Sequence, residues 1–281
     1  MDLQLSLLVL LAAFMHAVWN TLVKSSGDRL IQLALLNMVS AVVAVFAIPW
    51  VGVPDPASWG YILASIIIHT AYYLFLLQAY RFGDLSHVYP LARGVSPLVV
   101  AVLSIVFAAE TLNTGQLASV LLVSVSVASL AWNGRWSQRD EMKSILFAVA
   151  TGFMIGGYTL TDGTGVRLSG NALGYIAWLF ALDWIPIAVI AAVLRRRSLG
   201  QAVRDQWRSS ALGGMLAIGA YGLVIWALSL GAMAPVAALR ETSVVMAALI
   251  GTTFLREPFG KRRIAAAIGV AGGVIVLRMS G

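Results

Sequence analysis

The chain has 281 residues, of which 60% are hydrophobic and only 11% charged, and its net charge is +7. A soluble domain carries roughly 25% charged residues, so this composition excludes a soluble protein and indicates a chain that lies in a lipid bilayer. There is no cysteine, which excludes disulfides and thiolate chemistry. The three histidines, His16, His69 and His87, are too scattered to indicate a metal site, and we predict neither a metal nor another cofactor.

The apolar segments, taken in chain order, predict a bundle of membrane helices. The first segment lacks the basic leader and the cleavage site of a signal peptide, so we expect it to be a membrane helix. A spanning helix needs about 20 apolar residues. Ten segments have about that length: 4–24, 30–50, 58–80, 86–108, 114–133, 143–162, 171–194, 209–230, 234–255 and 260–278. Turn residues separate them, and one such turn, "DGTG", places Asp162 in an external loop. The predicted fold class is an all-α polytopic membrane protein with ten transmembrane helices.

The two halves of the chain repeat each other. Residues 91–110 align with 238–257 at five identical positions, which pair Arg93 with Arg240, Ser96 with Ser243, Ala101 with Ala248, Phe107 with Phe254 and Glu110 with Glu257. We expect Glu110 and Glu257 to cap or pair at the ends of their helices. Each half holds five predicted helices, and because five is odd, the second half must enter the membrane in the opposite orientation. The sequence thus predicts two inverted five-helix repeats, at 1–133 and 143–281, joined by a cytoplasmic linker at 134–142.

The basic residues predict the orientation of the chain. Fifteen of the 19 Lys and Arg residues lie in the loops after the first, third, fifth, seventh and ninth helices, whereas Arg167 and Arg278 alone lie on the other side. Basic loops stay in the cytoplasm. We therefore expect a multi-pass protein of the cell (inner) membrane with both termini external, on the periplasmic side. The positive charge belongs to these loops, so no nucleic-acid partner is predicted.

Two long segments, one in each half, share an order of helix, proline, helix, glutamate and Gly/Ala-rich helix. They read "YPLARGVSPLVVAVLSIVFAAETLNTGQLASVLLVSVSVASLA" and "APVAALRETSVVMAALIGTTFLREPFGKRRIAAAIGVAGGVIVLR", and a further motif, "HAVWNTLVK", lies in the first helix. With ten helices and a five-helix repeat, the chain resembles the drug/metabolite transporter superfamily, EamA type, over nearly its whole length.

This resemblance implies a ten-helix inverted-repeat carrier with a central cavity near the midplane of the bilayer. Members of the family move small metabolites, often outward, and these include amino acids, sugars and nucleotide-sugars. The motif "HAVWN" is similar to a subgroup found beside phosphonate metabolism. Relatives are usually drawn with cytoplasmic termini, whereas the loop charges of this chain predict external ones.

Four ionisable residues lie within predicted spans: Arg93, Asp183, Arg240 and Glu241. A charge at a helix centre costs about 2.5–3.5 kcal/mol, so such groups normally face a cavity or a partner. Arg93 and Arg240 are candidate substrate-binding residues, because the guanidinium fork fits a carboxylate or phosphonate through two parallel hydrogen bonds. Asp183 and Glu241 are candidates for proton coupling or for pairing with the arginines, as in an Arg93–Asp183 pair. Neighbours on a helix point about 100° apart, so Arg240 and Glu241 are expected to pair poorly with each other.

The remaining candidate substrate-binding residues are polar or aromatic side chains in or beside the predicted spans. They are His16, Trp19, Asn20, His69, Tyr73, Tyr89, Tyr158, Tyr175, Trp178 and Ser243. His16 and Asn20 share one helix face, because they are four residues apart. The alternative for these residues is hydrogen bonding between helices or packing in the bundle.

The favoured function is a secondary transporter, either an exporter or a facilitator, that works by alternating access around a midplane cavity. Its substrate is expected to be a small polar metabolite, anionic or zwitterionic, such as an amino acid or organophosphonate. The alternative is a multidrug or cation exporter that uses a membrane-embedded carboxylate. The catalytic motifs HExxH and GxSxG are absent, so no enzyme is predicted. The expected partners are the substrate and the lipid bilayer, while proton coupling and a homodimer stay open.

Overall fold

The computed structural model describes residues 2–24, 28–83, 85–131, 139–255 and 260–280, and its regular elements in these ranges are all helical. Helices suit a chain in lipid, because each backbone N–H and C=O group must be satisfied within the segment. The helices are α1 (Leu3–Lys24), α2 (Arg29–Val51), the short η1 (Pro56–Ser58), α3 (Trp59–Phe82), α4 (Leu85–Phe107), α5 (Thr114–Ser129), α6 (Arg139–Leu168), α7 (Ala172–Leu194), α8 (Leu199–Leu230), α9 (Met233–Arg240), α10 (Thr242–Leu255) and α11 (Lys261–Met279).

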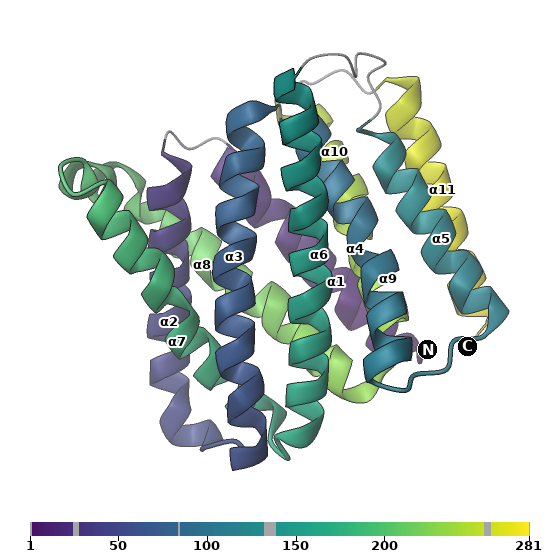
Figure 1. Cartoon of the computed structure of the whole chain (residues 1–281), viewed down its shortest axis with the longest axis horizontal. Coiled ribbons are helices and arrows are strands. Elements are labelled where there is room, and N and C mark those ends of the chain that lie inside the picture. Colours follow the sequence, from purple (N-terminus) through teal and green to yellow (C-terminus); the bar gives the residue numbers. More distant parts are fainter. Residues whose placement is uncertain (1, 25–27, 84, 132–138, 256–259, 281) are drawn as a thin grey trace.

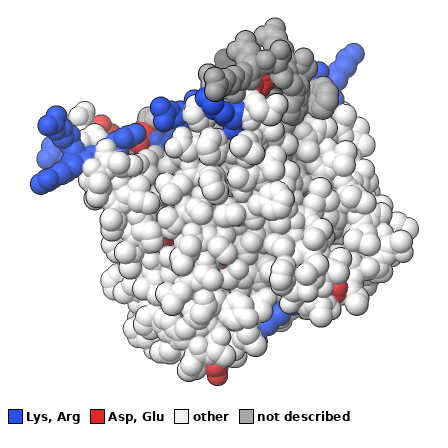
Figure 2. Space-filling model, viewed as in Figure 1, with Lys and Arg blue, Asp and Glu red and all other residues white. Residues whose placement is uncertain are grey.

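Eight apolar spans in the described part of the chain are long enough to cross a membrane, with α9 and α10 counted as one span. The helix α5 has 16 residues and is a shorter apolar helix, and α11 completes the set at the C-terminal end. The broad face of the molecule carries almost no charged side chains, as lipid contact requires (Figure 2). The predicted all-α polytopic membrane fold is confirmed, and the predicted number of ten helices agrees with these elements.

The helices pack as two related sets of five. The helix α3 packs on α6, and its repeat counterpart α8 packs on α1. Likewise, α4 packs on α6, and its counterparts α9 and α10 pack on α1. The pair α2 and α7 lies at one edge of the molecule and the pair α5 and α11 at the other (Figure 1). These contacts occur in matched pairs, as a pseudo-twofold relation between the two halves would give.

The helix α6 is longer than predicted at both ends. It begins at Arg139, inside the predicted linker 134–142, of which residues 134–138 lie outside the described residues. It continues to Leu168, so Asp162 is a buried helical residue, and its predicted loop position is wrong. The two glycines of "DGTG", Gly163 and Gly165, lie within α6 and allow close contacts with neighbouring side chains. A Cβ at Gly165 would lie 2.6 Å from the Tyr175 hydroxyl, which shows how closely α7 approaches.

Two further helices differ in length from their predicted ranges. The helix α8 begins at Leu199, ten residues before the predicted start, and has 32 residues. At 1.5 Å per residue it spans about 48 Å, which exceeds the roughly 30 Å of a hydrocarbon core. Its arginine-bearing first turns therefore extend the basic end of the molecule. The helix α5 ends at Ser129, where the prediction had it reach 133.

The predicted ninth helix, 234–255, is broken. The helix α9 ends at Arg240, the backbone turns at Glu241, and α10 begins at Thr242. The corresponding helix of the first half, α4, runs unbroken from Leu85 to Phe107 and contains Pro90 and Pro97. The break puts Arg240 and Glu241 at the junction of two short helices, in the middle of the bundle.

The start of α9 is held by polar contacts at the end of the molecule that carries the chain termini (Figure 1). Both carboxylate oxygens of Glu110 accept hydrogen bonds from the backbone N–H of Met233, at 2.9 and 3.1 Å. Arg167 pairs with Glu110 at 2.8 Å and also donates to the carbonyls of Leu228 and Gly231. Glu110 thus caps a helix, as predicted, whereas Glu257 lies outside the described residues.

Candidate functional site

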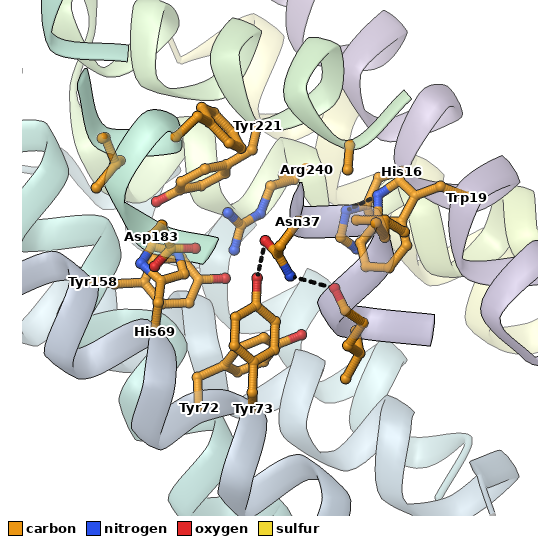
Figure 3. Close-up of a pocket in the computed structure, with 15 residues that line it drawn as sticks. His16, Trp19, Asn37, His69, Tyr72, Tyr73, Tyr158, Asp183, Tyr221 and Arg240 are labelled. Atoms are coloured by element: carbon orange, nitrogen blue, oxygen red, sulfur yellow. Dashed lines mark hydrogen bonds between the residues drawn. The ribbon is translucent and has the colours of Figure 1, made fainter. Parts of the chain in front are cut away.

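A cavity of about 60 Å³ lies at the centre of the bundle, enclosed by α1, α2, α3, α6, α7, α8 and α9 (Figure 3). Its lining includes seven of the predicted site residues: His16, Trp19, His69, Tyr73, Tyr158, Asp183 and Arg240. These side chains come from five helices, α1, α3, α6, α7 and α9. The fold therefore gathers polar groups, which are costly in lipid, around one internal space.

Arg240 reaches the cavity from the C-terminal end of α9 (Figure 3). Its side chain is only 3% exposed, and neither Nε nor Nη2 has a hydrogen-bond partner. The nearest carboxylate is that of Glu241, whose Oε1 lies 4.0 Å from Nε, the outer limit of an ion pair. A buried guanidinium normally satisfies its donors, because leaving a charged donor unpaired costs more than leaving a neutral one. Arg240 therefore offers free donors to whatever enters the cavity.

Arg93 is placed differently from its repeat partner. Its Nε lies 2.7 Å from Oε2 of Glu241, and both side chains are almost completely buried. Its Nη2 donates to Ser243 at 3.3 Å, and Ser96 donates to Glu241 at 3.4 Å. The predicted alternative in which Arg93 pairs with Asp183 is wrong, because Glu241 takes that role. Arg93, Ser243 and Glu241 form a polar cluster beside the cavity and are not part of its lining.

Asp183 faces the cavity from the middle of α7. Its Oδ1 is buried without a hydrogen-bond partner, and none of the ion pairs among the described residues includes it. The cavity wall thus carries a base and an acid that each have side-chain atoms without a hydrogen-bond partner. In the close-up, Arg240 lies between the group around Asp183 and the pair formed by His16 and Trp19 (Figure 3).

Aromatic rings form much of the wall. The rings of His69 and Tyr158 stack with their centroids 4.0 Å apart, and Tyr221 meets His69 edge-on at 5.4 Å. The Tyr73 hydroxyl donates to Oδ1 of Asn37 at 3.1 Å. Stacked and edge-on rings are a stiff lining with polar rims, because each ring has few rotatable bonds.

At the other end of the lining, Trp19 Nε1 donates to Nδ1 of His16 at 3.2 Å. This hydrogen bond requires that Nδ1 carries no proton, so a neutral His16 is protonated at Nε2. One turn further along α1, Asn20 donates to the His16 carbonyl and to the Tyr89 hydroxyl, at 3.1 and 3.4 Å. Asn20 and Tyr89 therefore link α1 to α4 outside the cavity lining.

A family model described as the EamA-like transporter family matches residues 4–132 and again residues 142–279. The chain belongs to the EamA-like transporter family. It is therefore a multi-pass membrane protein of a family that transports small molecules, in contact with bilayer lipid. Among solved structures, 29 chains match, and one crystal structure covers 98% of this chain and 96% of its own, with 15% identity and a TM-score of 0.79. That likeness shows the fold. A search of curated proteins gave no match.

Two predicted site residues of this EamA protein lie away from the cavity lining, at the end with the termini. Trp178 donates to the Gly52 carbonyl at 3.3 Å and meets Trp59 edge-on, so it packs α7 against the α2–α3 connection. Tyr175 is fully buried and donates to Asp162 at 3.0 Å. Both residues make structural contacts in this conformation.

Three polar lining residues were not among the predicted site residues: Asn37, Tyr72 and Tyr221. Asn37 and Tyr221 are isolated polar groups in strongly apolar stretches, which is the signal that would have found them. Tyr72 is adjacent to Tyr73, and the sequence does not show that both rings reach the cavity from one helix.

Proposed function

We propose that this protein is a secondary carrier for a small zwitterionic or anionic metabolite, such as an amino acid or an organophosphonate, that works by alternating access around the central cavity. The observation that supports it is the buried guanidinium of Arg240 in the cavity wall, whose Nε and Nη2 have no hydrogen-bond partner. Arg93 is paired with Glu241, so among the described lining residues Arg240 is the cation available to an anion. A carboxylate or phosphonate would satisfy the Arg240 donors through two parallel hydrogen bonds.

Asp183 favours a zwitterion over a simple anion. Its free oxygen faces the same cavity as Arg240, so a substrate with an ammonium group and an anionic group can neutralise both residues. A cavity of about 60 Å³ is small. It has room for a few water molecules, whereas small-molecule sites usually enclose about 300 Å³ or more. A substrate that fits the cavity in this conformation is therefore compact.

The packing supports access from the basic end of the molecule. At the end with the termini, every residue of α9 is buried, and Glu110 and Arg167 fasten the start of this helix to α8. The Lys and Arg side chains gather at the opposite rim (Figure 2). Because basic loops stay in the cytoplasm, we place that rim in the cytoplasm and both termini in the periplasm of an inner membrane.

The alternative, a multidrug or cation exporter, is supported by Asp183 alone. Its unpaired carboxylate lies among aromatic rings, and rings attract cations through their negatively charged faces. A cation that binds there must also approach the unpaired Arg240, which repels it. The two functions therefore differ in which residue binds the ligand.

Thermal-shift binding on purified protein separates these functions. The ligands are L-alanine, its phosphonate analogue 1-aminoethylphosphonate, and two compounds that each keep one charge, propionate and ethylamine. We expect the zwitterions to stabilise the protein more than either singly charged compound. Arg240→Gln should weaken zwitterion binding about 30-fold, the equivalent of roughly 2 kcal/mol for hydrogen bonds to a charged group.

Two variants complete the experiment. Asp183→Asn should weaken zwitterion binding and leave propionate binding intact. Arg197→Gln removes the same charge as Arg240→Gln from an exposed position and should change nothing. If ethylamine binds best and Asp183→Asn abolishes its binding, the cation exporter is the better description. If no ligand binds more weakly to Arg240→Gln than to Arg197→Gln, Arg240 is not a substrate residue.

A further inference from the structure

Asp162 is a completely buried carboxylate of α6 that the proposed substrate site does not use. Two tyrosine hydroxyls donate to it from two other helices. Tyr175 of α7 donates to Oδ1 at 3.0 Å, and Tyr221 of α8 donates to Oδ2 at 2.5 Å. Gly165, one turn further along α6, makes the Tyr175 contact possible, because any side chain at this position would overlap the tyrosine.

The charge of Asp162 has no partner in the described part of the chain. Glu241, the other completely buried acid, lies 2.7 Å from an arginine, whereas none of the ion pairs among the described residues includes Asp162. An ionised carboxylate in a dry interior depends on its hydrogen bonds when it lacks a counter-ion. The titratable and charged groups around it come from five helices. They are His69 on α3, Tyr158 on α6 itself, Tyr175 and Asp183 on α7, Tyr221 on α8 and Arg240 on α9.

Tyr221 belongs to both the carboxylate site and the cavity. Its hydroxyl is bonded to Asp162, while the residue lines the cavity, where its ring meets His69 and Tyr158 at 5.4 and 5.5 Å. Tyr175 makes a similar hydrogen bond to the same carboxylate but is not part of the lining. A molecule that enters the cavity can therefore act on one of these two tyrosine donors to Asp162 and not on the other.

We propose that Asp162 is a proton-binding site of this carrier and that Tyr221 couples its protonation to the occupancy of the cavity. When a ligand draws the Tyr221 hydroxyl into the cavity, Asp162 loses the donor on the cavity side and keeps the hydroxyls of Tyr175 and Ser65. The buried carboxylate then takes up one proton from a hydronium ion of the aqueous phase, whose O–H bond breaks. No covalent bond other than the new O–H bond forms, and the net charge of the protein rises by one. Because linkage is reciprocal, ligand binding strengthens as the pH falls. The coupling to a ligand rests on the proposed function, whereas the proton site does not.

Infrared spectroscopy of the ligand-free protein in lipid tests the proton site. The C=O stretch of a protonated carboxyl group is compared between the parent and Asp162→Asn across a range of pH. We expect one carboxyl band that appears as the pH falls and is missing from Asp162→Asn. Tyr221→Phe, which keeps the carboxylate, should move the pH at which this band appears. If the two spectra differ by no pH-dependent band, Asp162 does not change protonation and the proposal is overturned, whatever the substrate.

Calorimetry in two buffers of different ionisation enthalpy tests the coupling, with L-alanine as the probe. The parent should take up about one proton for each L-alanine bound, a value set by the single carboxylate. Tyr221→Phe should bind without proton uptake, and Tyr175→Phe, which removes the matching donor, should retain it. Equal uptake in both variants overturns the role of Tyr221. An absence of binding contradicts the substrate class proposed above, and the infrared result still decides the proton site.

Discussion

The two intramembrane arginines occupy matched places in the repeat and have different partners. Arg93 is neutralised by Glu241, while Arg240 has free donors in the cavity. Removal of one member of a buried pair leaves the other charge without compensation, and typical losses are about 3–5 kcal/mol. The two arginines should therefore respond differently to substitution.

We expect Arg93→Ala to lower the thermal stability of the ligand-free protein by an amount that corresponds to roughly 3–5 kcal/mol. The physical reason is the unpaired Glu241 carboxylate that the substitution leaves in the bundle. The measurement is thermal unfolding in detergent. Arg240→Gln serves as the comparison and should have a smaller effect, because the Arg240 side chain has few partners to lose.

The double variant Arg93→Met/Glu241→Gln removes both charges and should recover most of the stability lost in Arg93→Ala. A double variant as unstable as the single one would show that the loss comes from packing and not from the unpaired charge.

For single residues, the sequence predicts which side chains are unusual in a membrane helix but not which of them contact one another. The cost of charge in lipid singles out Arg93, Arg240, Glu241 and Asp183, and the structure places all four in or beside one central site. The contacts of these four residues depend on how each helix is rotated and on the break at Glu241. The spacing of side chains in the sequence shows neither. The predicted loop position of Asp162 is wrong because glycines follow this residue, and glycine is common in turns as well as in closely packed membrane helices.

The helix α6 shows how turn-like residues serve in a membrane helix. Small residues allow helices to approach closely in lipid, where tight packing replaces the hydrophobic effect as the driving force. Gly165 lies against the Tyr175 ring and Tyr61, while Gly157 of the same helix has only an ordinary contact, 3.6 Å from Ile68 to a Cβ placed there. The C-terminal boundary of α6 could not be predicted, because glycines occur both where a helix ends and where two helices pack closely.

Gly165→Ala should destabilise the protein by about 1–3 kcal/mol, since the new methyl group must displace Tyr175 or Tyr61. Gly157→Ala is the matched control and should be neutral or stabilising by up to about 1 kcal/mol, because alanine favours the helix. Denaturation of both variants in detergent measures the difference. Equal stability of the two variants would mean that the close contact at Gly165 relaxes without cost.

The whole molecule has one basic end and one end with few charges (Figure 2). The chain lacks cysteine, so a single introduced cysteine reports its location without a background signal. Ala57, in η1 near the end with the termini, and Gly200, near the start of α8 at the basic end, are both exposed. These positions lie at opposite ends of the bundle.

With the proposed orientation, a maleimide that cannot cross membranes should label Ala57→Cys in intact cells. It should label Gly200→Cys only after the membrane is opened, because basic segments remain in the cytoplasm. The reverse pattern would place the termini in the cytoplasm and would invert the access side proposed for the cavity.

The break at Glu241 makes the second half differ from the first. In the repeat alignment, Glu241 matches Gly94, and a Cβ at Gly94 would lie 2.7 Å from the backbone nitrogen of Ala128. The first half therefore has no room for an acidic side chain at position 94, next to Arg93, because α4 and α5 pack together there. If the halves exchange their packing during transport, Arg240 finds no equivalent of the ion pair that Arg93 now makes. In that case the ligand-free protein would favour the conformation in which Arg93 is paired, and the proposed transport cycle would leave and regain this conformation.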